Sequence, residues 1–309
     1  MDAENKLKVL VDWLSVSSKI HGSDTWIKDL GLESETFDQR NGFYGYRLRL
    51  HFDGISIHYA GHNESMGTLL EMSGQGCRRF ETSGSGDYER IFDDVAENPG
   101  EMNITRLDIA CDDTEGFLPL EYIAGKVRNG EFVSRWQDWS IEESSKGLTV
   151  AHGSKKSDVY VRIYDKARER GFNDGQHWVR CELQLRDKLA ARFAQLILQG
   201  KPVGEIYAGV MKNYLRYIEP DASRKERCST SAFWERFLNN AEGIKIYEKP
   251  GVDYNLMNLH SYVVDQAGNS TWTLAQVIGW DGVRKLLEEK AKKLNQNHRA
   301  ILVKHGRKE

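Results

Sequence analysis

Residues 158–170 read DVYVRIYDKARER, and this stretch decides the fold class. Its small apolar residues, Val159, Val161 and Ile163, alternate with larger polar ones, which is the period of a half-buried β-strand. Alternation sends successive side chains to opposite faces of a sheet. The strand therefore packs one face on a core, and its other face carries Tyr160, Arg162, Tyr164 and Lys166.

Similar alternation recurs along the first two thirds of the chain and predicts further strands at 8–17, 102–113, 132–137, 147–152 and 177–186. Asp53-Gly54 marks the turn of a hairpin over 42–61. Residues 68–81 read as a strand followed by a glycine-rich turn. Helical patterns cover 25–32, 87–98, 118–130 and 187–200. The mixture predicts an α+β fold, an antiparallel sheet with helices on one face, built as two ferredoxin-like halves.

Strand patterns fade beyond about residue 200, where 233–240, 273–280 and 281–306 read as helices. We therefore predict two parts, a sheet domain over residues 1–205 and a mostly helical C-terminal region over residues 206–309. At 309 residues the chain is long enough for two such parts.

The net charge of −3 hides a strongly uneven distribution. Residues 86–121 hold eleven acidic and two basic residues, whereas 146–170 hold seven basic and three acidic ones, and 280–309 hold nine basic and four acidic ones. Acidic blocks can hold a divalent cation and basic blocks can hold phosphate, although each is also typical of a solvated surface. No apolar run is long enough to span a membrane, and the N-terminus lacks a signal-peptide pattern, so we expect a cytoplasmic protein without membrane contact.

Carboxylates occupy strand positions that normally carry apolar or neutral side chains. Asp108 in TRLDIACDD and Glu182 in HWVRCELQLR lie on the faces opposite their core residues, and Glu71 lies inside an apolar run. A buried carboxylate needs a partner, because leaving it unpaired is costly. If the strands are neighbours, these oxygens converge and suit Mg²⁺ or Mn²⁺. Ordinary salt bridges across the sheet are the alternative.

A tyrosine beside such a site can act as a nucleophile toward phosphate. Its phenol has an ordinary pKa near 10, so a nearby cation must help it to ionise. Lys166 is a candidate for that cation, but for any single tyrosine among thirteen, packing is the simpler explanation.

Five segments taken in order resemble the Rep_trans family of rolling-circle replication initiators, whose relatives include phage initiation factors and relaxases of conjugative elements. They are VDWLSVS (11–17), EMSGQGCRRFE (71–81), TRLDIACDD (105–113), GSKKSDVYVRIYDKARE (153–169) and HWVRCELQL (177–185). The family nicks one DNA strand with a tyrosine that stays bound to the 5′ end, assisted by a divalent metal. The HxH motif of other nickases is absent from this sequence, and the Rep_trans family does not need it.

The resemblance implies roles for particular residues. It makes Tyr164 the nucleophile, with Tyr160 as its rival, and gives Arg162 and Lys166 the task of holding phosphate charge. Asp108, Glu182 and Glu71 are the implied ligands of Mg²⁺ or Mn²⁺. DNA contacts are expected from Lys155, Lys156, Arg168 and Arg180.

The sequence therefore predicts a metal-dependent DNA nicking-closing initiator of rolling-circle replication, with residues 1–205 as the nicking domain. Its expected partner is origin DNA, single-stranded, supercoiled or in a hairpin, with a host helicase and a second copy of the chain as further candidates. Two alternatives are a relaxase of a conjugative element and an origin-binding regulator that does not cut.

Overall fold

The computed structural model describes residues 7–145, 147–172, 175–242, 263 and 268–291. The chain divides into two compact units, residues 1–246 and residues 247–309. The described part of the second unit contains helix α10 (Gly268–Ala291), in which Gly279 has non-helical φ and ψ angles. Among the described helices, none combines the length and apolarity needed to cross a bilayer.

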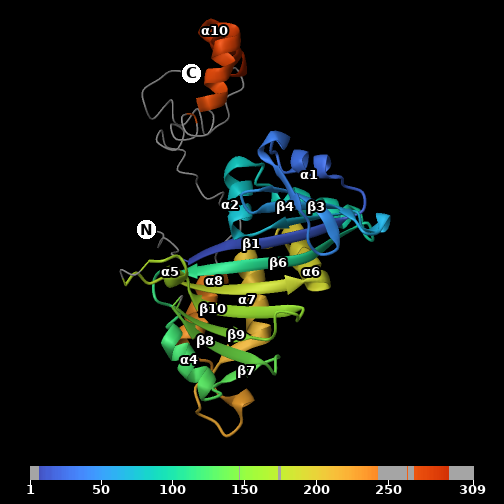
Figure 1. Ribbon diagram of the computed structural model, residues 1–309. Helices are drawn as coiled ribbons and strands as arrows, with labels where there is room; N and C mark the ends of the chain where they lie inside the picture. Colours follow the sequence, from blue (N-terminus) through green and yellow to red (C-terminus); the bar gives the residue numbers. More distant parts are fainter. Residues whose placement is uncertain (1–6, 146, 173–174, 243–262, 264–267, 292–309) are drawn as a thin grey trace. The chain divides into compact units, whose positions relative to one another are not determined.

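The first unit combines strands and helices throughout its length (Figure 1). Its strands are β1 (Leu7–Ser18), β2 (Asp38–Asn41), β3 (Tyr46–Phe52), β4 (Ile55–Gly61), β5 (Thr68–Met72), β6 (Met102–Asp113), β7 (Phe132–Ser134), β8 (Trp139–Ser144), β9 (Gly147–His152), β10 (Val159–Asp165), β11 (Val179–Arg186) and β12 (Leu215–Tyr217). Its α-helices are α1 (Ser23–Asp29), α2 (Gly74–Ser83), α3 (Tyr88–Glu97), α4 (Leu120–Arg128), α5 (Lys166–Glu169), α6 (Asp187–Leu198), α7 (Val203–Tyr214) and α8 (Ala232–Glu242). Short 3₁₀ turns are η1 (Ser34–Thr36), η2 (Glu64–Met66) and η3 (Lys225–Arg227).

Ten strands form one sheet in the order β2-β3-β4-β5-β1-β6-β11-β10-β9-β8, and β12 pairs with β7 in a separate ribbon. Each neighbouring pair is antiparallel, so the predicted antiparallel α+β fold is confirmed. Two halves are recognisable, and in each the first strand (β1 or β6) pairs with the last strand of a four-strand meander. That order differs from the ferredoxin-like one, in which the first strand lies between two later strands and not at the end of the half.

The two faces of the sheet differ in character. Apolar residues from one face join those of α1–α4 and α6–α8 in a single core, and α6, α7 and α8 run behind the middle strands in Figure 1. On β6, for example, Leu107, Ile109 and Cys111 are fully buried in this core. The other face of β6, β10 and β11 carries charged groups, and we call it the polar face: Arg106, Asp108, Asp112, Arg162, Tyr164, Arg180 and Glu182. The register therefore confirms the prediction that each of these strands has one apolar face and one charged face.

Several predicted elements need correction. The glycine-rich segment after residue 72 begins helix α2, because the Ser73 side chain caps it by accepting a hydrogen bond from the Gly76 amide. Strands β2 and β8 and helix α7 were not predicted. The predicted division at residues 205–206 falls inside α7, which packs on the sheet with α8, and the compact unit extends to residue 246. The predicted helix over 281–306 is observed as far as Ala291, and its remainder lies outside the described residues.

Asp113, at the end of β6, organises the turn that leads into α4. It is fully buried, and its carboxylate accepts hydrogen bonds from the backbone amides of Glu115 (2.9 Å), Gly116 (3.0 Å) and Leu118 (2.7 Å). Nε2 of His177 lies 3.1 Å from the same carboxylate.

We predict that Asp113→Ala lowers the free energy of unfolding by about 2–4 kcal/mol, because the substitution removes the acceptor of three backbone amides, including the buried amide of Leu118. Asp113→Asn keeps one amide oxygen as an acceptor and should cost clearly less. Urea denaturation of both variants measures the difference, and equal losses would contradict this role of the carboxylate.

Candidate active site

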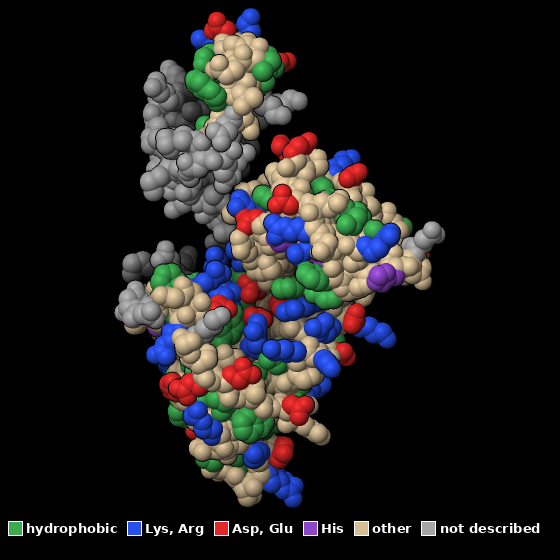
Figure 2. Space-filling model, in the orientation of Figure 1, with side chains coloured by type: hydrophobic (Ala, Val, Ile, Leu, Met, Phe, Trp, Pro, Cys, Tyr) green, Lys and Arg blue, Asp and Glu red, His purple; other side chains and the backbone are tan. Residues whose placement is uncertain are grey.

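The candidate site lies on the polar face, where β6, β11 and β10 are neighbours. Direct pairing across β10 and β11 sets Arg162 opposite Glu182 and Tyr164 opposite Arg180. Arg180 in turn lies opposite Asp112 of β6. Facing residues of an antiparallel pair have their Cβ atoms about 5 Å apart, so these side chains must interact. Lys, Arg, Asp and Glu side chains gather over the middle strands in Figure 2.

Tyr164 lies at the centre of this group and is only 6% exposed. Its hydroxyl donates to Oε2 of Glu182 at 3.2 Å, and Nζ of Lys166 lies 3.5 Å from the same hydroxyl. The guanidinium of Arg162 lies 5.3 Å from the ring centre. Burial, and next the charge of Glu182, raise the pKa of the Tyr164 phenol well above its usual value. The hydroxyl therefore holds its proton in this state, with a carboxylate ready to accept it.

Two arginines neutralise the two carboxylates of the site. Arg162 donates to Oε1 of Glu182 at 2.5 Å, and Arg106 binds both oxygens of Asp108, at 2.9 Å through Nε and at 2.5 Å through a terminal nitrogen. The Arg106 guanidinium also lies 4.2 Å from the ring centre of Trp13. Burial, together with the charge of Glu182, outweighs Arg106 and raises the pKa of Asp108 to about 7.

This shift predicts how stability depends on pH. The folded protein holds a proton on Asp108 up to about pH 7, whereas the unfolded chain releases it near the ordinary value of 3.8. Since the folded state binds more protons in this window, its stability falls as pH rises from about 4 to 7. In the presence of a chelator we expect the melting temperature to decrease over this range, and Asp108→Asn should flatten the decrease. A wild-type profile with the same slope as the variant would contradict the shift.

Arg180 joins three strands. Its guanidinium binds both oxygens of Asp112 on β6, at 2.6 and 2.8 Å, and Oδ1 of Asp12 on β1 at 2.7 Å. Only 5% of its side chain is exposed. Asp12 reaches it because β1 has a register shift between Val11 and Trp13, and such bulges redirect a side chain. Asp12, Asp112 and Arg180 thus form a closed charged group beside Tyr164.

The other predicted site residues lie farther out. Glu71 of β5 is separated from β6 by β1, and it interacts with Tyr44 and Arg106. Lys155 and Lys156 are exposed in the loop between β9 and β10. Arg168 of α5 is exposed and pairs with Asp165 at 3.5 Å. Tyr160, the rival tyrosine, lies on the polar face opposite Gln184.

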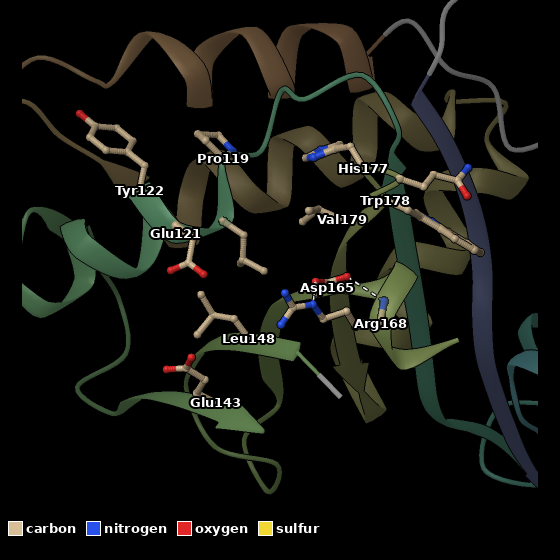
Figure 3. A pocket seen from close by; sticks show the side chains of 12 residues that line it. Pro119, Glu121, Tyr122, Glu143, Leu148, Asp165, Arg168, His177, Trp178 and Val179 are labelled. Carbon is tan, nitrogen blue, oxygen red and sulfur yellow. Dashed lines mark hydrogen bonds and ion pairs between the residues drawn. The ribbon is translucent and has the colours of Figure 1, made fainter. Parts of the chain in front are cut away.

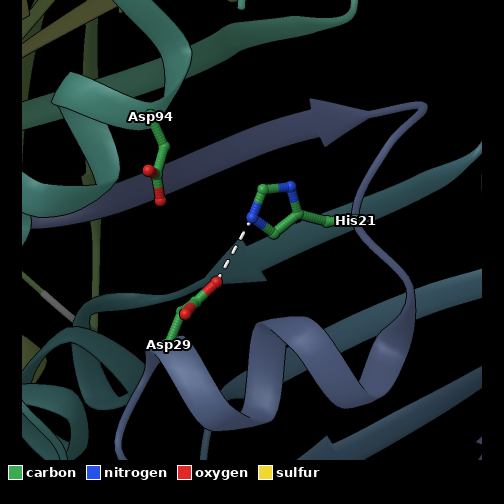
Figure 4. A group of neighbouring side chains, drawn as sticks. All are labelled: His21, Asp29 and Asp94. Atoms are coloured by element: carbon green, nitrogen blue, oxygen red, sulfur yellow. Dashed lines mark ion pairs between the residues drawn. The ribbon is translucent and has the colours of Figure 1, made fainter. Parts of the chain in front are cut away.

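Two of the three predicted metal ligands lie on adjacent strands of the polar face. Asp108 and Glu182 are neighbouring oxygen donors whose charges repel each other, and this donor set fits Mg²⁺ or Mn²⁺. Glu71 does not join them. Within the part of the chain that the structure describes, the group of three potential ligands that lie within 4.8 Å of one another is His21, Asp29 and Asp94 (Figure 4). There Asp29 already binds Arg90 at 2.6 Å and His21 at 3.2 Å, so these contacts account for the cluster.

A pocket of about 440 Å³ opens where β9, β10 and β11 meet the start of α4 (Figure 3). Its lining includes Tyr122, Asp165, Arg168, His177 and Trp178. Asp165 directly follows Tyr164 in the chain, so the pocket adjoins the end of the strand that carries the tyrosine.

Sequence reasoning missed Asp12, and it left the partners of Asp112 and Arg106 open. Alternation already placed Asp112 and Arg106 on the correct face, and their pairing became evident only from the register. Asp12 gave no signal, because the bulge in β1 breaks the alternation at that residue.

Comparison with known proteins agrees with this architecture. The Rep_trans model, described as "Replication initiation factor", matches residues 102–289, and a model described as "Rolling Circle replication initiation protein N-terminal domain" matches residues 8–93. The two matches correspond to the two halves of the sheet, since β1–β5 precede residue 93 and β6 begins at Met102.

Individual relatives point the same way. The chain is 30% identical over 270 residues to the protein named "Putative DNA relaxase NicK" of Bacillus subtilis (strain 168), covering 81% of this chain and 76% of that protein. It also matches the solved structure of a rolling-circle replication initiator protein from Geobacillus stearothermophilus, with a TM-score of 0.71 and 32% identity over 78% of this chain and 99% of that one. The chain therefore belongs to the replication initiation factor family and carries, in its first half, the N-terminal domain of rolling-circle replication initiation proteins.

Proposed function

We propose that this protein initiates rolling-circle replication by cutting and rejoining one DNA strand, with Tyr164 as the nucleophile. The observation that carries the proposal is the hydrogen bond from the Tyr164 hydroxyl to Glu182, in a setting of arginine and lysine side chains. The family membership supplies the class of reaction, and this contact supplies a nucleophile with its base.

The cleavage step forms one bond to phosphorus and breaks another, and its protons pass through Glu182 and water. Oη of Tyr164 attacks the phosphorus of one phosphodiester, and its proton passes to Glu182 along the existing hydrogen bond. The bond from phosphorus to the 3′ oxygen breaks. This oxygen takes a proton from water to become a 3′-hydroxyl, and Glu182 returns its proton to water. The 5′ phosphate stays bound to Tyr164. Reversal of these steps, with a 3′-hydroxyl as attacking group, closes the strand.

Arg162 and Lys166 are placed to stabilise the charge that develops on the phosphate. The side chain of Arg162 is 35% exposed, while its partner Glu182 is 4% exposed, so the arginine is the more accessible partner. Guanidinium groups match phosphate geometry with paired hydrogen bonds. Lys166 lies on the other side of the phenol and favours its ionised form.

Asp108 and Glu182 are the residues that would hold a divalent cation. Such a cation, when bound, would polarise the phosphate oxygens and offset the repulsion between the two carboxylates. The chain's own contribution is to hold both carboxylates on adjacent strands through Arg106 and Arg162.

Binding to DNA should depend on the exposed lysines of the β9–β10 loop. We expect Lys155→Ala together with Lys156→Ala to weaken binding to any DNA sequence and to reduce the slope of log K against log salt by about 2. Fluorescence anisotropy at several salt concentrations measures this slope. Lys212→Ala, which removes an exposed lysine of α7, serves as the control, and an unchanged slope in the loop variant would contradict the assignment.

The proposed function itself is tested with supercoiled plasmid that carries the origin from the chain's own genetic neighbourhood, in the presence of Mg²⁺ or Mn²⁺. We expect conversion to open circles and to relaxed closed circles, which require rejoining. Tight binding without conversion under any metal would favour a regulator that does not cut.

A further inference from the structure

Two large aromatic side chains are exposed in the loop between β2 and β3. Phe43 is 53% exposed and Tyr44 is 65% exposed. Single exposed apolar residues are ordinary on protein surfaces, so exposure alone says little. The strained backbone of the loop and the arginines beside its rings are stronger indications of a binding role.

Contacts with the buried side chain of His58 on β4 hold the loop in place. Tyr44 adopts φ +56°, a left-handed conformation that is strained for a residue with a side chain. The Phe43 amide donates to Nδ1 of His58 at 3.4 Å, and the Tyr44 ring centre lies 5.6 Å from that of His58. His58 is fully buried, and its Nε2 has no hydrogen-bond partner among the described residues. Residues held under strain in this way cluster at functional positions.

The loop also borders the polar face. Its Tyr44 interacts with Glu71 of β5, which shares a row with Ser15 of β1 and Arg106 of β6. Two aromatic rings near this row have an arginine against them. Arg49 lies 4.6 Å from the ring centre of Phe43, and Arg106 lies 4.2 Å from that of Trp13.

Aromatic rings paired with arginine are the groups that bind unpaired nucleic-acid bases, because every base has a π face to stack on them while arginine attracts the backbone. Bases inside a duplex are stacked on each other and cannot use such rings. Phe43 and Tyr44 contact His58 of β4, and five strand spacings of about 4.8 Å separate β4 from β10, so this contact lies roughly 24 Å from the strand of Tyr164. A single DNA strand laid across the sheet would span this distance with several nucleotides.

We propose that Phe43 and Tyr44 form a stacking subsite for an unpaired base of the DNA strand, several nucleotides from the phosphate that is cut. The inference rests on the proposed function, because it takes the same DNA as its ligand. It adds that the protein selects single-stranded DNA at the β2–β3 loop independently of the chemistry at Tyr164.

The test measures binding in the full-length Tyr164→Phe protein, so that cleavage does not interfere. Phe43→Ala and Tyr44→Gly are combined separately with this background and titrated with a single-stranded origin oligonucleotide and with its duplex. We expect a roughly 5- to 100-fold loss of affinity for the single strand and little change for the duplex. A 2-aminopurine scanned along the oligonucleotide should lose its stacking signal at one position in both variants.

Two features separate binding from folding. Tyr44→Gly removes the ring and relieves the left-handed strain, so this variant should melt at a temperature equal to or above that of its parent. Trp139→Ala is the matched control: Trp139 is 46% exposed but lies opposite buried His152, on the core side of the sheet. This control should bind both DNAs like its parent.

The outcomes are distinct. If the parent binds the single strand and both loop variants bind equally well, or lose duplex binding to the same extent, the stacking subsite is ruled out and the proposed function stands. If the parent binds neither DNA, the proposed function fails and this inference fails with it.

Discussion

Replacing Tyr164 with phenylalanine is expected to reduce strand cleavage by at least about a thousandfold and to leave DNA binding within about twofold. The substitution removes one oxygen atom, and that atom is the proposed attacking group. The ring stays in place between Arg162 and Lys166, whose contacts with it do not depend on the hydroxyl. Cleavage of supercoiled DNA and binding by anisotropy are measured on the same preparation.

Tyr160→Phe is the matched control, because Tyr160 lies on the same strand and face, four residues away, and is similarly buried at 7% exposure. It should cut at close to the wild-type rate. A fully active Tyr164→Phe protein beside an inactive Tyr160→Phe protein would transfer the nucleophile to Tyr160.

The second large effect is expected on stability. Arg180→Met should lower the free energy of unfolding by about 3–5 kcal/mol, because it leaves the buried charge of Asp112 and the partly buried charge of Asp12 without their partner. Methionine preserves much of the side-chain volume, so the decrease in the free energy of unfolding comes mainly from the lost charge and not from lost packing. Urea denaturation at pH 7 measures it.

Two further variants check the cause. Adding Asp112→Asn to Arg180→Met removes one of the stranded charges and should recover part of the loss, with a coupling that a double-mutant cycle measures. Arg192→Met, on the exposed side of α6, should change stability by less than about 0.5 kcal/mol. A loss below about 1 kcal/mol for Arg180→Met would show that the group carries little of the stability.

Alternation of side chains was sufficient to predict the polar face. Asp108, Glu182, Arg162 and Tyr164 were all assigned to the side opposite the core, and the register places them there. This works because the period of a strand is local and both faces of these strands have a clear character. The assignment of these residues to DNA chemistry came from the resemblance of five segments to a family, not from periodicity.

Strand order could not be read in the same way. The pairing of β1 with both β5 and β6 depends on contacts between residues far apart in sequence, and no local pattern encodes it. That order also separates Glu71 from Asp108 and Glu182. Strand β2, with four exposed residues, gave no alternation to detect. The bulge in β1 prevented the prediction of Asp12 from alternation. The sequence also did not predict that Arg180 pairs with two aspartates.

The most direct test of the account is to identify the residue that becomes linked to DNA. The protein is incubated with origin DNA and Mg²⁺ or Mn²⁺, denatured, digested with protease and nuclease, and analysed by mass spectrometry. We predict a nucleotide adduct on the phenol of Tyr164, absent from the Tyr164→Phe protein. An adduct on a different residue, or cleavage that leaves no adduct on any peptide, would contradict the central claim.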